Sequence, residues 1–290
     1  MALARLSARA VIHEAGGPLF SGPRRPANIV AMTLAGFTET TFTHDGATRT
    51  VYRRGEGPAV VIMHEIPGIT PPVAAFATRV ADAGFSVYLP HLFGTPGKPL
   101  SPLYMMGELG RACIAREFTV LASRASSPIT SWLRALCRHA HAEIGGKGVG
   151  ALGMCLTGNF ALALMVDPVV MAPVLSQPSL PFAIGRERCA GLHLSDEDLA
   201  IVKQRVAEGC PVLGLRFTAD PMVPKARFDR LRHELGEGFE AIEIDSSRGN
   251  PHAIPRTAHS VVTNDLVDEA GHPTRAALER VLAFFAERLR

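Results

Sequence analysis

A cysteine stands at residue 155, inside the segment GALGMCLTGNFALALM that covers residues 150–165. An apolar run ends just before it and a second one begins at Gly158, so the cysteine falls between a predicted strand and a predicted helix. Gly153 and Thr157 flank it, giving the order small–any–cysteine–any–small that is typical of a strained turn lifting a nucleophile clear of a sheet. Most cysteines are buried structural side chains, so this segment alone leaves both roles open.

The same turn would provide part of an anion site. The N–H of Leu156 would lie at the N-terminus of the predicted helix, where it can donate to an oxyanion forming on a substrate. The positive end of that helix also favours a thiolate over a thiol. A second donor is expected from the turn after the run PAVVIMHE (58–65), where Ile66 follows Glu65.

An acidic residue and two histidines follow later strand-like runs. Asp220 stands just beyond PVLGLRF (211–217), although by itself it could equally cap a helix or close a turn. His252 and His259 both come after the last predicted strand, so either could be a base. The order nucleophile, acid, histidine is that of the α/β-hydrolases. Three matching residues at three strand ends favour a triad over three separate coincidences.

Each member of this triad would have a defined role. Cys155 would attack an acyl carbon, because a thiolate is a strong nucleophile near neutral pH. The histidine would hold the thiolate as an ion pair and then carry the proton needed for attack by water. Asp220 would fix the imidazole tautomer and stabilise its protonated form. The predicted chemistry is acyl transfer to water through an acyl-cysteine.

The elements that must position these residues alternate along the chain. A hairpin over 37–53 comes first, and buried or alternating runs then predict strands at 58–65, 85–90, 148–154, 169–175, 211–217 and 239–245. Helical spacing is found at 71–84, 128–144, 158–166, 224–235 and 273–289, after Ser195, and near 111–122 within the loop-rich stretch 91–127. This order predicts an α/β class, with a mostly parallel twisted sheet covered by helices on both faces. Catalytic groups in such a sheet collect at the carboxyl ends of the strands.

Composition excludes several other classes of protein. The 290 residues are 47% hydrophobic and 20% charged, and a net charge of +3 is too small and too dispersed for nucleic-acid binding. No apolar run is long enough to cross a membrane. The histidines are scattered, and the pair His64-Glu65 lacks the second histidine of a zinc-protease helix, so neither a metal nor an organic cofactor is expected. The chain has five cysteines, an odd number, and their spacing is not that of a disulfide-bonded framework. This indicates reduced thiols and a cytoplasmic location.

The first residues differ in character from the rest. Residues 1–31 are basic and then rich in Gly and Pro, without the apolar core of a signal peptide. We interpret 1–36 as an N-terminal extension, either poorly ordered or produced by a start codon upstream of Met32. Residues 37–290 are then one catalytic domain.

These motifs resemble the dienelactone hydrolase family, whose members are cysteine-nucleophile enzymes of the α/β-hydrolase fold. The resemblance covers roughly 37–289 and is carried by HEIPG (64–68), GMCL (153–156), Asp220-Pro221 with Val223-Pro224, and His259-Ser260. It implies that His259 rather than His252 is the base. It also implies that Glu65 contacts the cysteine thiol and takes part in its activation, where the residues alone would suggest a helix cap or a loop charge.

The sequence departs from the family at several places. Thr157 stands where glycine is common, which narrows the space beneath the turn, and Thr263 stands where the founding enzymes have an arginine for the substrate carboxylate. An insertion around 185–209 is absent from the shortest members. The resemblance therefore implies hydrolase chemistry on a small ester or lactone, without specifying the dienelactone substrate.

Other functions stay open at this stage. The same triad would serve a thioesterase or an acyltransferase, and the same fold without catalysis would be a ligand-binding protein. A redox-sensing role for Cys155 is a further alternative, because exposed thiols of low pKa oxidise readily. The oligomeric state is left open.

Overall fold

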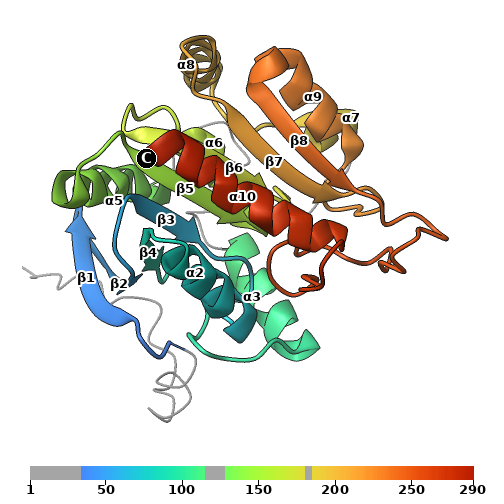
Figure 1. Cartoon of the computed structure of the whole chain (residues 1–290), viewed down its shortest axis with the longest axis horizontal. Coiled ribbons are helices and arrows are strands. Elements are labelled where there is room, and N and C mark those ends of the chain that lie inside the picture. Colours follow the sequence, from blue (N-terminus) through green and yellow to red (C-terminus); the bar gives the residue numbers. More distant parts are fainter. Residues whose placement is uncertain (1–33, 115–127, 180–184) are drawn as a thin grey trace, which may run out of the picture.

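The computed structural model describes residues 34–114, 128–179 and 185–290, and one eight-stranded sheet forms its centre (Figure 1). The strands are β1 (Thr38–His44), β2 (Ala47–Arg54), β3 (Ala59–Met63), β4 (Ser86–Pro90), β5 (Val149–Met154), β6 (Val170–Ser176), β7 (Val212–Phe217) and β8 (Phe239–Ile244). Their spatial order is β1-β2-β4-β3-β5-β6-β7-β8. Only the hairpin β1–β2 and the pair β2–β4 are antiparallel. The predicted α/β-hydrolase fold is confirmed, and the carboxyl ends of six parallel strands share one edge.

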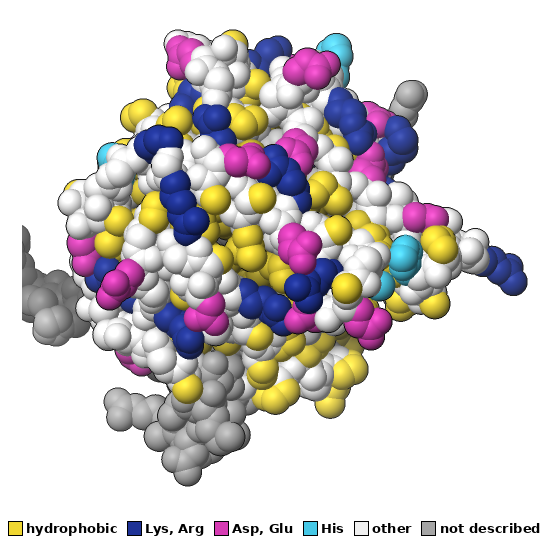
Figure 2. Space-filling view, viewed as in Figure 1, with side chains coloured by type: hydrophobic (Ala, Val, Ile, Leu, Met, Phe, Trp, Pro, Cys, Tyr) yellow, Lys and Arg dark blue, Asp and Glu magenta, His cyan; other side chains and the backbone are white. Residues whose placement is uncertain are grey.

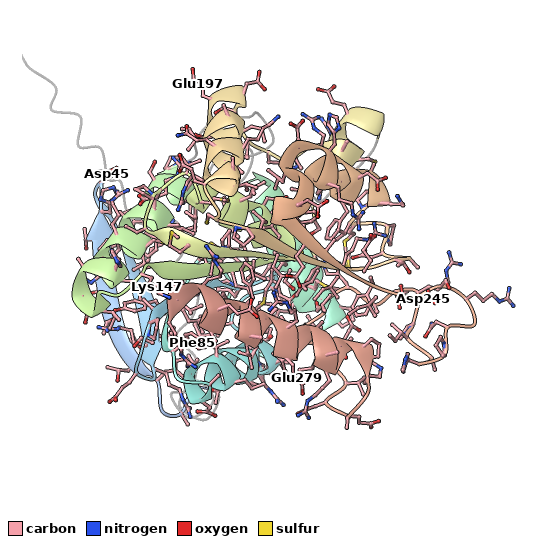
Figure 3. All side chains as sticks on the ribbon, turned by 45° about the horizontal axis from the view of Figure 1, so that its top comes forward. Asp45, Phe85, Lys147, Glu197, Asp245 and Glu279 are labelled. Carbon is pink, nitrogen blue, oxygen red and sulfur yellow. The ribbon has the colours of Figure 1, made fainter. Side chains whose placement is uncertain are left out.

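Both faces of the sheet are buried, as the continuous apolar runs predict. On β3, Val60 and Ile62 point to one hydrophobic cluster and Val61 and Met63 to the other, since successive side chains in a strand alternate. Side chains fill the space between the sheet and the helices on both sides (Figure 3). The strands can therefore hold their ends in fixed positions relative to one another.

Two layers of helices cover the sheet (Figure 1). α2 (Pro71–Asp82) and α10 (Pro273–Leu289) pack on one face, where Phe76 and Phe285 are buried. The other face is covered by α5 (Pro128–Ile144), α6 (Gly158–Leu164), α8 (Asp196–Ala207) and α9 (Lys225–Leu235). The Ser195 hydroxyl caps α8 by accepting from the Asp198 N–H at 3.0 Å, as its sequence predicts. Short 3-10 turns η2 (Cys155–Thr157) and η3 (Gly236–Gly238) precede α6 and β8.

One helix lies elsewhere than predicted. The helix expected near 111–122 begins earlier than predicted, because α3 spans Pro102–Ile114, and residues 115–122 fall outside the described residues. Ser101 opens α3, and its hydroxyl accepts from the Tyr104 N–H at 3.3 Å. Leu103 and Met106 are 85% and 69% exposed, so apolar side chains lie on the outer face and hide the usual helical periodicity.

One short helix was not predicted from the sequence. α7 (Arg186–Ala190) lies between the strand predicted at 169–175 and the helix predicted after Ser195, where the sequence pattern predicts no helix. Its five residues are too few for a periodic pattern, and Arg227 of α9 holds it by donating to the carbonyl oxygens of Arg188 and Gly191. A contact distant in sequence, rather than local preference, therefore stabilises this helix.

The surface agrees with the modest net charge. Figure 2 shows Lys and Arg side chains interspersed with Asp and Glu side chains on the displayed face. Across the described parts of the chain, no helix combines the length and the apolar character needed to cross a bilayer. The proposed extension 1–36 lies mostly outside the described residues, and Leu34 at its end is buried against the face that carries α2 and α10.

Candidate active site

The nucleophile turn has the strained backbone that its sequence predicts. Cys155 follows β5 directly and has φ of +57°, a left-handed conformation that costs a residue with a Cβ about 1–3 kcal/mol. Thr157 stabilises the turn from below. Its hydroxyl accepts from the Met154 N–H at 3.0 Å and lies 2.8 Å from the Met63 carbonyl oxygen at the end of β3. The threonine that replaces the usual glycine thus ties the turn to the neighbouring strand.

Gly153 cannot carry a side chain. A Cβ at this position would lie 2.0 Å from the Thr157 carbonyl oxygen and 2.9 Å from the Gly158 Cα, which are backbone atoms rather than the end of a flexible side chain. We expect Gly153→Ala to lower the free energy of unfolding by about 3 kcal/mol or more, as severe overpacking does. Urea denaturation followed by circular dichroism would measure the loss.

Gly150→Ala in the same strand is the matched control. The added Cβ would meet side-chain atoms of Phe285 and Val60 at 3.0–3.1 Å, and side chains can yield where backbone cannot. This variant should lose clearly less stability than Gly153→Ala. Equal losses for the two variants would contradict the argument from the turn.

Asp220 and His259 form a buried acid–base pair. His259 Nδ1 and Asp220 Oδ2 are 2.6 Å apart, with 14% and 2% of the two side chains exposed. The other carboxylate oxygen of Asp220 accepts from the Met222 N–H at 2.9 Å, which fixes the orientation of the carboxylate. The His259 N–H in turn donates to Asp265, so backbone and ring are both held.

The charge state of His259 follows from its neighbours. Burial lowers its pKa, but the negative charge on Cys155 and the hydrogen bond to Asp220 outweigh burial and raise the pKa well above 6.5. A thiolate at Cys155 and the carboxylate of Asp220 thus both favour the protonated imidazole. This is the state required to hold a cysteine thiolate as an ion pair.

This raised pKa predicts how stability changes with pH. A histidine whose pKa is higher in the folded than in the unfolded state stabilises the fold fully below the unfolded pKa, and the gain is lost as the pH rises through the folded pKa. The free energy of unfolding should therefore fall as the pH rises above about 6.5, and it should fall more steeply than in His259→Gln. Urea denaturation across this range tests the difference, and parallel curves for the two proteins would contradict it.

The sulfur of Cys155 is held by a hydroxyl. Its Sγ lies 3.0 Å from Ser179 Oγ, and the Ser179 N–H donates to the Cys155 carbonyl oxygen at 3.0 Å. His259 Nε2, the atom facing away from Asp220, is buried and has no hydrogen-bond partner within the described residues. Cys155 lies near enough to raise the pKa of His259, so the ring nitrogen that a nucleophilic cysteine needs is available beside the thiol.

Glu65 lies at the end of β3 and is almost fully buried. Its carboxylate accepts hydrogen bonds from four neutral groups, which are the side chains of Ser260, Thr263, Asn264 and Gln177. The hydrogen bonds of Glu65 therefore join β3 to the loop that carries His259, while the thiol of Cys155 bonds to Ser179. A part for Glu65 in thiol activation stays a prediction.

His252 is separate from this cluster. It is exposed, and its ring packs edge-to-face on that of His272, with centroids 5.2 Å apart. The loop that begins at Asp245 projects from the edge of the sheet (Figure 3). The residues alone could not choose between the two histidines, and the structure brings His259 to Asp220.

Comparison with known proteins gives the family of this chain. The family model described as "Dienelactone hydrolase family" matches residues 47–289. The chain belongs to the dienelactone hydrolase family. It is therefore an enzyme of the ester- or lactone-hydrolase type, and the predicted family resemblance is confirmed.

Individual relatives of this dienelactone hydrolase family member are distant. A Saccharomyces cerevisiae protein named "Putative carboxymethylenebutenolidase" is 25% identical over 196 residues, which are 67% of this chain and 69% of the yeast protein. A Klebsiella pneumoniae structure named "Putative Dienelactone Hydrolase" has a TM-score of 0.58 at 20% identity, over 87% of this chain and 98% of that one. The dienelactone hydrolase from Anabaena variabilis has a TM-score of 0.55 at 14% identity, over 88% and 100%. These structural likenesses support the fold.

Two backbone N–H groups of this family member are candidates for an oxyanion hole. Ile66 follows Glu65 after β3, and its N–H has no acceptor among the described residues. Leu156 follows Cys155 in η2, at the N-terminal end of the continuous helical segment formed by η2 and α6, where N–H groups point out of the helix. A role for Ile66 and Leu156 as oxyanion donors stays a prediction.

Sequence reasoning missed the residues that surround the thiol and Glu65. Ser179 and Gln177 lie just beyond β6, and Gln177 adopts a left-handed φ of +35° with its side chain fully buried. Polar residues directly after a buried strand at the catalytic edge were the signal available, and they follow the strand predicted at 169–175. The carboxyl end of β6 therefore contributes to the site along with β3, β5 and β7.

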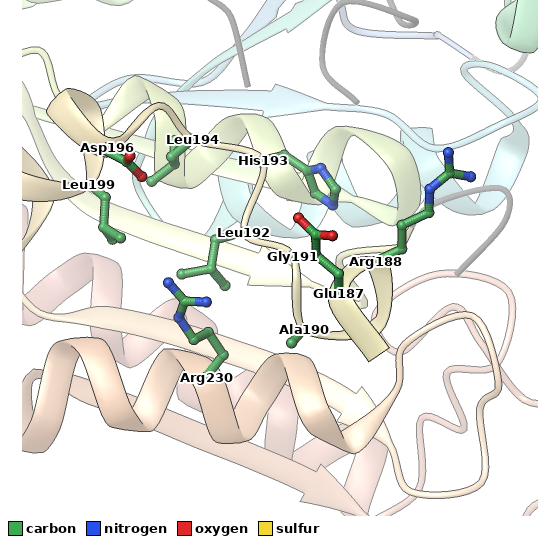
Figure 4. Close-up of a pocket in the computed structure, with 10 residues that line it drawn as sticks. All are labelled: Glu187, Arg188, Ala190, Gly191, Leu192, His193, Leu194, Asp196, Leu199 and Arg230. Carbon is green, nitrogen blue, oxygen red and sulfur yellow. The ribbon is translucent and has the colours of Figure 1, made fainter. Parts of the chain in front are cut away.

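The insertion around 185–209 forms a pocket of its own. α7, α8 and α9 enclose a pocket of about 270 Å³, lined by Leu192, Leu194 and Leu199 and by charged residues that include Arg188 and Arg230 (Figure 4). None of the proposed triad residues lies in its lining. Within the described residues, no cluster of His, Cys, Asp or Glu side chains is suited to hold a metal ion.

Proposed function

We propose that this enzyme hydrolyses a small carboxylic ester or lactone through an acyl-cysteine intermediate on Cys155. The single observation that carries the proposal is the buried pair of His259 and Asp220 beside a cysteine in a left-handed turn. A buried charge is costly unless an opposite charge pairs with it, and Asp220 pairs with His259 through Nδ1. This pairing leaves His259 Nε2 available to the thiol. Family membership supports the hydrolase type, and the residues supply the mechanism.

The reaction would begin with rotation of the Cys155 side chain from Ser179 toward His259, whose Nε2 takes the thiol proton, so that a thiolate and an imidazolium form. The Cys155 thiolate then attacks the carbonyl carbon, forming a C–S bond while the carbonyl π electrons move onto oxygen. The N–H groups of Ile66 and Leu156 would stabilise this oxyanion. Collapse expels the alcohol or enol oxygen, which takes its proton from His259, and leaves an acyl-cysteine.

Water would complete the cycle. His259, now neutral, removes a proton from water, whose oxygen attacks the thioester carbon and releases the acid and the thiolate. Asp220 holds the imidazole in one tautomer throughout. Glu65 would act in this mechanism by fixing the loop that carries His259 against the loop that carries Ile66. Neither step requires a metal or an organic cofactor.

Activated esters should be the better substrates. In the tetrahedral intermediate a thiolate competes with the alcohol oxygen as the leaving group, and it leaves more readily than an alkoxide. Aryl esters and enol lactones release more stable anions than alkyl esters do, so their tetrahedral intermediates should more often give the acyl-cysteine than return to the ester.

The location in the cytoplasm belongs to the same proposal, supported by the four described cysteines, which are all free thiols.

The test is turnover together with capture of the intermediate. We expect the purified protein to hydrolyse p-nitrophenyl acetate, and an enol lactone faster than a simple alkyl ester. Acid quenching followed by peptide mass spectrometry should find an acetyl group on Cys155. An acetyl group on a different residue, or no turnover of any ester, lactone or thioester in the panel, would contradict the proposal.

A further inference from the structure

His64 is a buried histidine that the proposed mechanism does not use. It ends the run that forms β3, it is fully buried, and its ring packs edge-to-face on Phe93, with centroids 4.5 Å apart. Its two ring nitrogens both have backbone partners. Leu92 N–H donates to Nε2 at 3.0 Å, and Nδ1 lies 3.1 Å from the carbonyl oxygen of Glu65.

These contacts determine the tautomer of His64. Burial lowers its pKa to about 3, so the ring is neutral and carries one proton at neutral pH. Nε2 accepts from the Leu92 N–H and must therefore be the bare nitrogen. The proton is on Nδ1, and the ring donates it to the Glu65 carbonyl oxygen.

That carbonyl belongs to the peptide group whose N–H is the candidate oxyanion donor. The Glu65 oxygen also accepts from the Gly68 N–H at 2.9 Å, so two donors hold it from one side. In a planar trans peptide the C=O and the N–H point in opposite directions, so fixing the oxygen also aims the Ile66 N–H. Hydrogen bonds accepted by the oxygen also polarise the peptide and strengthen its N–H as a donor.

We infer that His64 is a positioning residue for the oxyanion hole, holding and polarising the Glu65–Ile66 peptide through its Nδ1–H. This inference rests on the proposed function, because it gives the Ile66 N–H a role that only acyl transfer requires. His64 touches no reacting atom. Its effect on catalysis would be exerted entirely through the peptide that follows it.

Two amide variants separate the bonds of the ring. The short side chain of His64→Asn can place its NH₂ group where Nδ1–H stands, so it can keep the bond to Glu65 and lose the bond to Leu92. The longer side chain of His64→Gln can place its oxygen where Nε2 stands, so it can keep the bond to Leu92 and lose the bond to Glu65. Both remain polar and uncharged in the same buried position.

The readout is binding of an aryl trifluoromethyl ketone. The Cys155 thiolate adds to the ketone carbon, and the resulting oxyanion lies where the oxyanion of the ester intermediate would form. We expect His64→Gln to bind the ketone about tenfold more weakly and to lose kcat by a similar factor with KM nearly unchanged. His64→Asn should stay within about threefold of the wild type in both measurements.

Alkylation by iodoacetamide distinguishes positioning from general damage. Alkylation needs the thiolate and forms no oxyanion, so its rate should be the same in the wild type and both variants. Equal ketone affinity in His64→Gln and the wild type would overturn the inference, as would a fall in alkylation rate that matches the fall in affinity. A wild-type protein that hydrolyses no ester and forms no ketone adduct would overturn the proposed function, and the inference with it.

A spectroscopic test needs no variant. Nitrogen-15 NMR of the wild type should show His64 as the neutral Nδ1–H tautomer at pH 7, unchanged down to about pH 5 because its pKa lies far below. An Nε2–H tautomer or a charged ring at pH 7 would overturn the inference directly.

Discussion

Replacing Cys155 with alanine should lower kcat/KM for an aryl ester by about 10⁴-fold or more. The loss is this large because no other described residue offers a nucleophile on the strained turn after β5, and the histidine cannot act without the thiolate it serves. Alanine keeps the Cβ and removes the interactions of Sγ with Ser179 and His259, without opening a large cavity. The stability of the fold should therefore change little, and initial rates of p-nitrophenyl acetate hydrolysis at matched folded concentration measure the effect.

Cys155→Ser and a second cysteine provide the controls. Serine keeps a hydroxyl on the same turn but ionises much less readily than a thiol, so activity should still fall severely. Cys210→Ala removes a buried thiol that bonds to carbonyl oxygens at the end of the sheet remote from the site, and it should retain wild-type kcat. Full activity in Cys155→Ala would show that the nucleophile lies elsewhere.

Asp220→Asn should lower kcat by about 10²- to 10⁴-fold. One oxygen of Asp220 accepts from the Met222 N–H, so the oxygen of an asparagine would take that place and its NH₂ group would face His259 Nδ1. A donor there requires Nδ1 to be bare and moves the ring proton to Nε2. His259 could then no longer take a proton at the atom facing the thiol.

The pH dependence distinguishes this mechanism from simple disruption. Without the carboxylate, one of the causes that raise the pKa of His259 is removed, so this pKa should fall in Asp220→Asn. Proton NMR of the imidazole would follow the change. Asp245→Asn, an exposed carboxylate at the end of β8, is the matched control and should keep wild-type kcat. An Asp220→Asn variant with wild-type kcat would remove Asp220 from the mechanism.

The site is built from strand ends that are far apart along the chain. Glu65 lies 195 residues from Ser260 in sequence, yet their side chains are 2.7 Å apart. Arg227 of α9 makes a second set of such contacts. Its buried guanidinium donates to the carbonyl oxygens of Pro178, Arg188 and Gly191, and these bonds fix the chain next to Ser179. Burial lowers the pKa of Arg227 to about 10, so it remains charged at neutral pH and a strong donor. These contacts hold the thiol, the histidine loop and the insertion in one arrangement.

The sequence alone was sufficient for the sheet and for the candidate triad. Buried strands are continuous apolar runs and amphipathic helices have a period, so residues 149–154 and 128–144 are recognisable from local pattern. The parallel order then requires the residues after each strand to meet at one edge, which predicts that Cys155, Asp220 and one of the two histidines lie together, and the family resemblance favours His259 over His252. The strained turn was equally predictable, because only small neighbours such as Gly153 permit it.

The tertiary structure decided which polar groups meet, because such pairing leaves no periodic signal. Ser179 rather than Glu65 bonds to the thiol, and Glu65 accepts from neutral donors that include Ser260 and Thr263. α3 was misplaced because its exposed apolar side chains obscure its period. The tautomer of His64 depends on an N–H donated from 28 residues away. Local spacing determines the elements and the edge where they end, whereas distances between residues remote in sequence arise only when the layers pack.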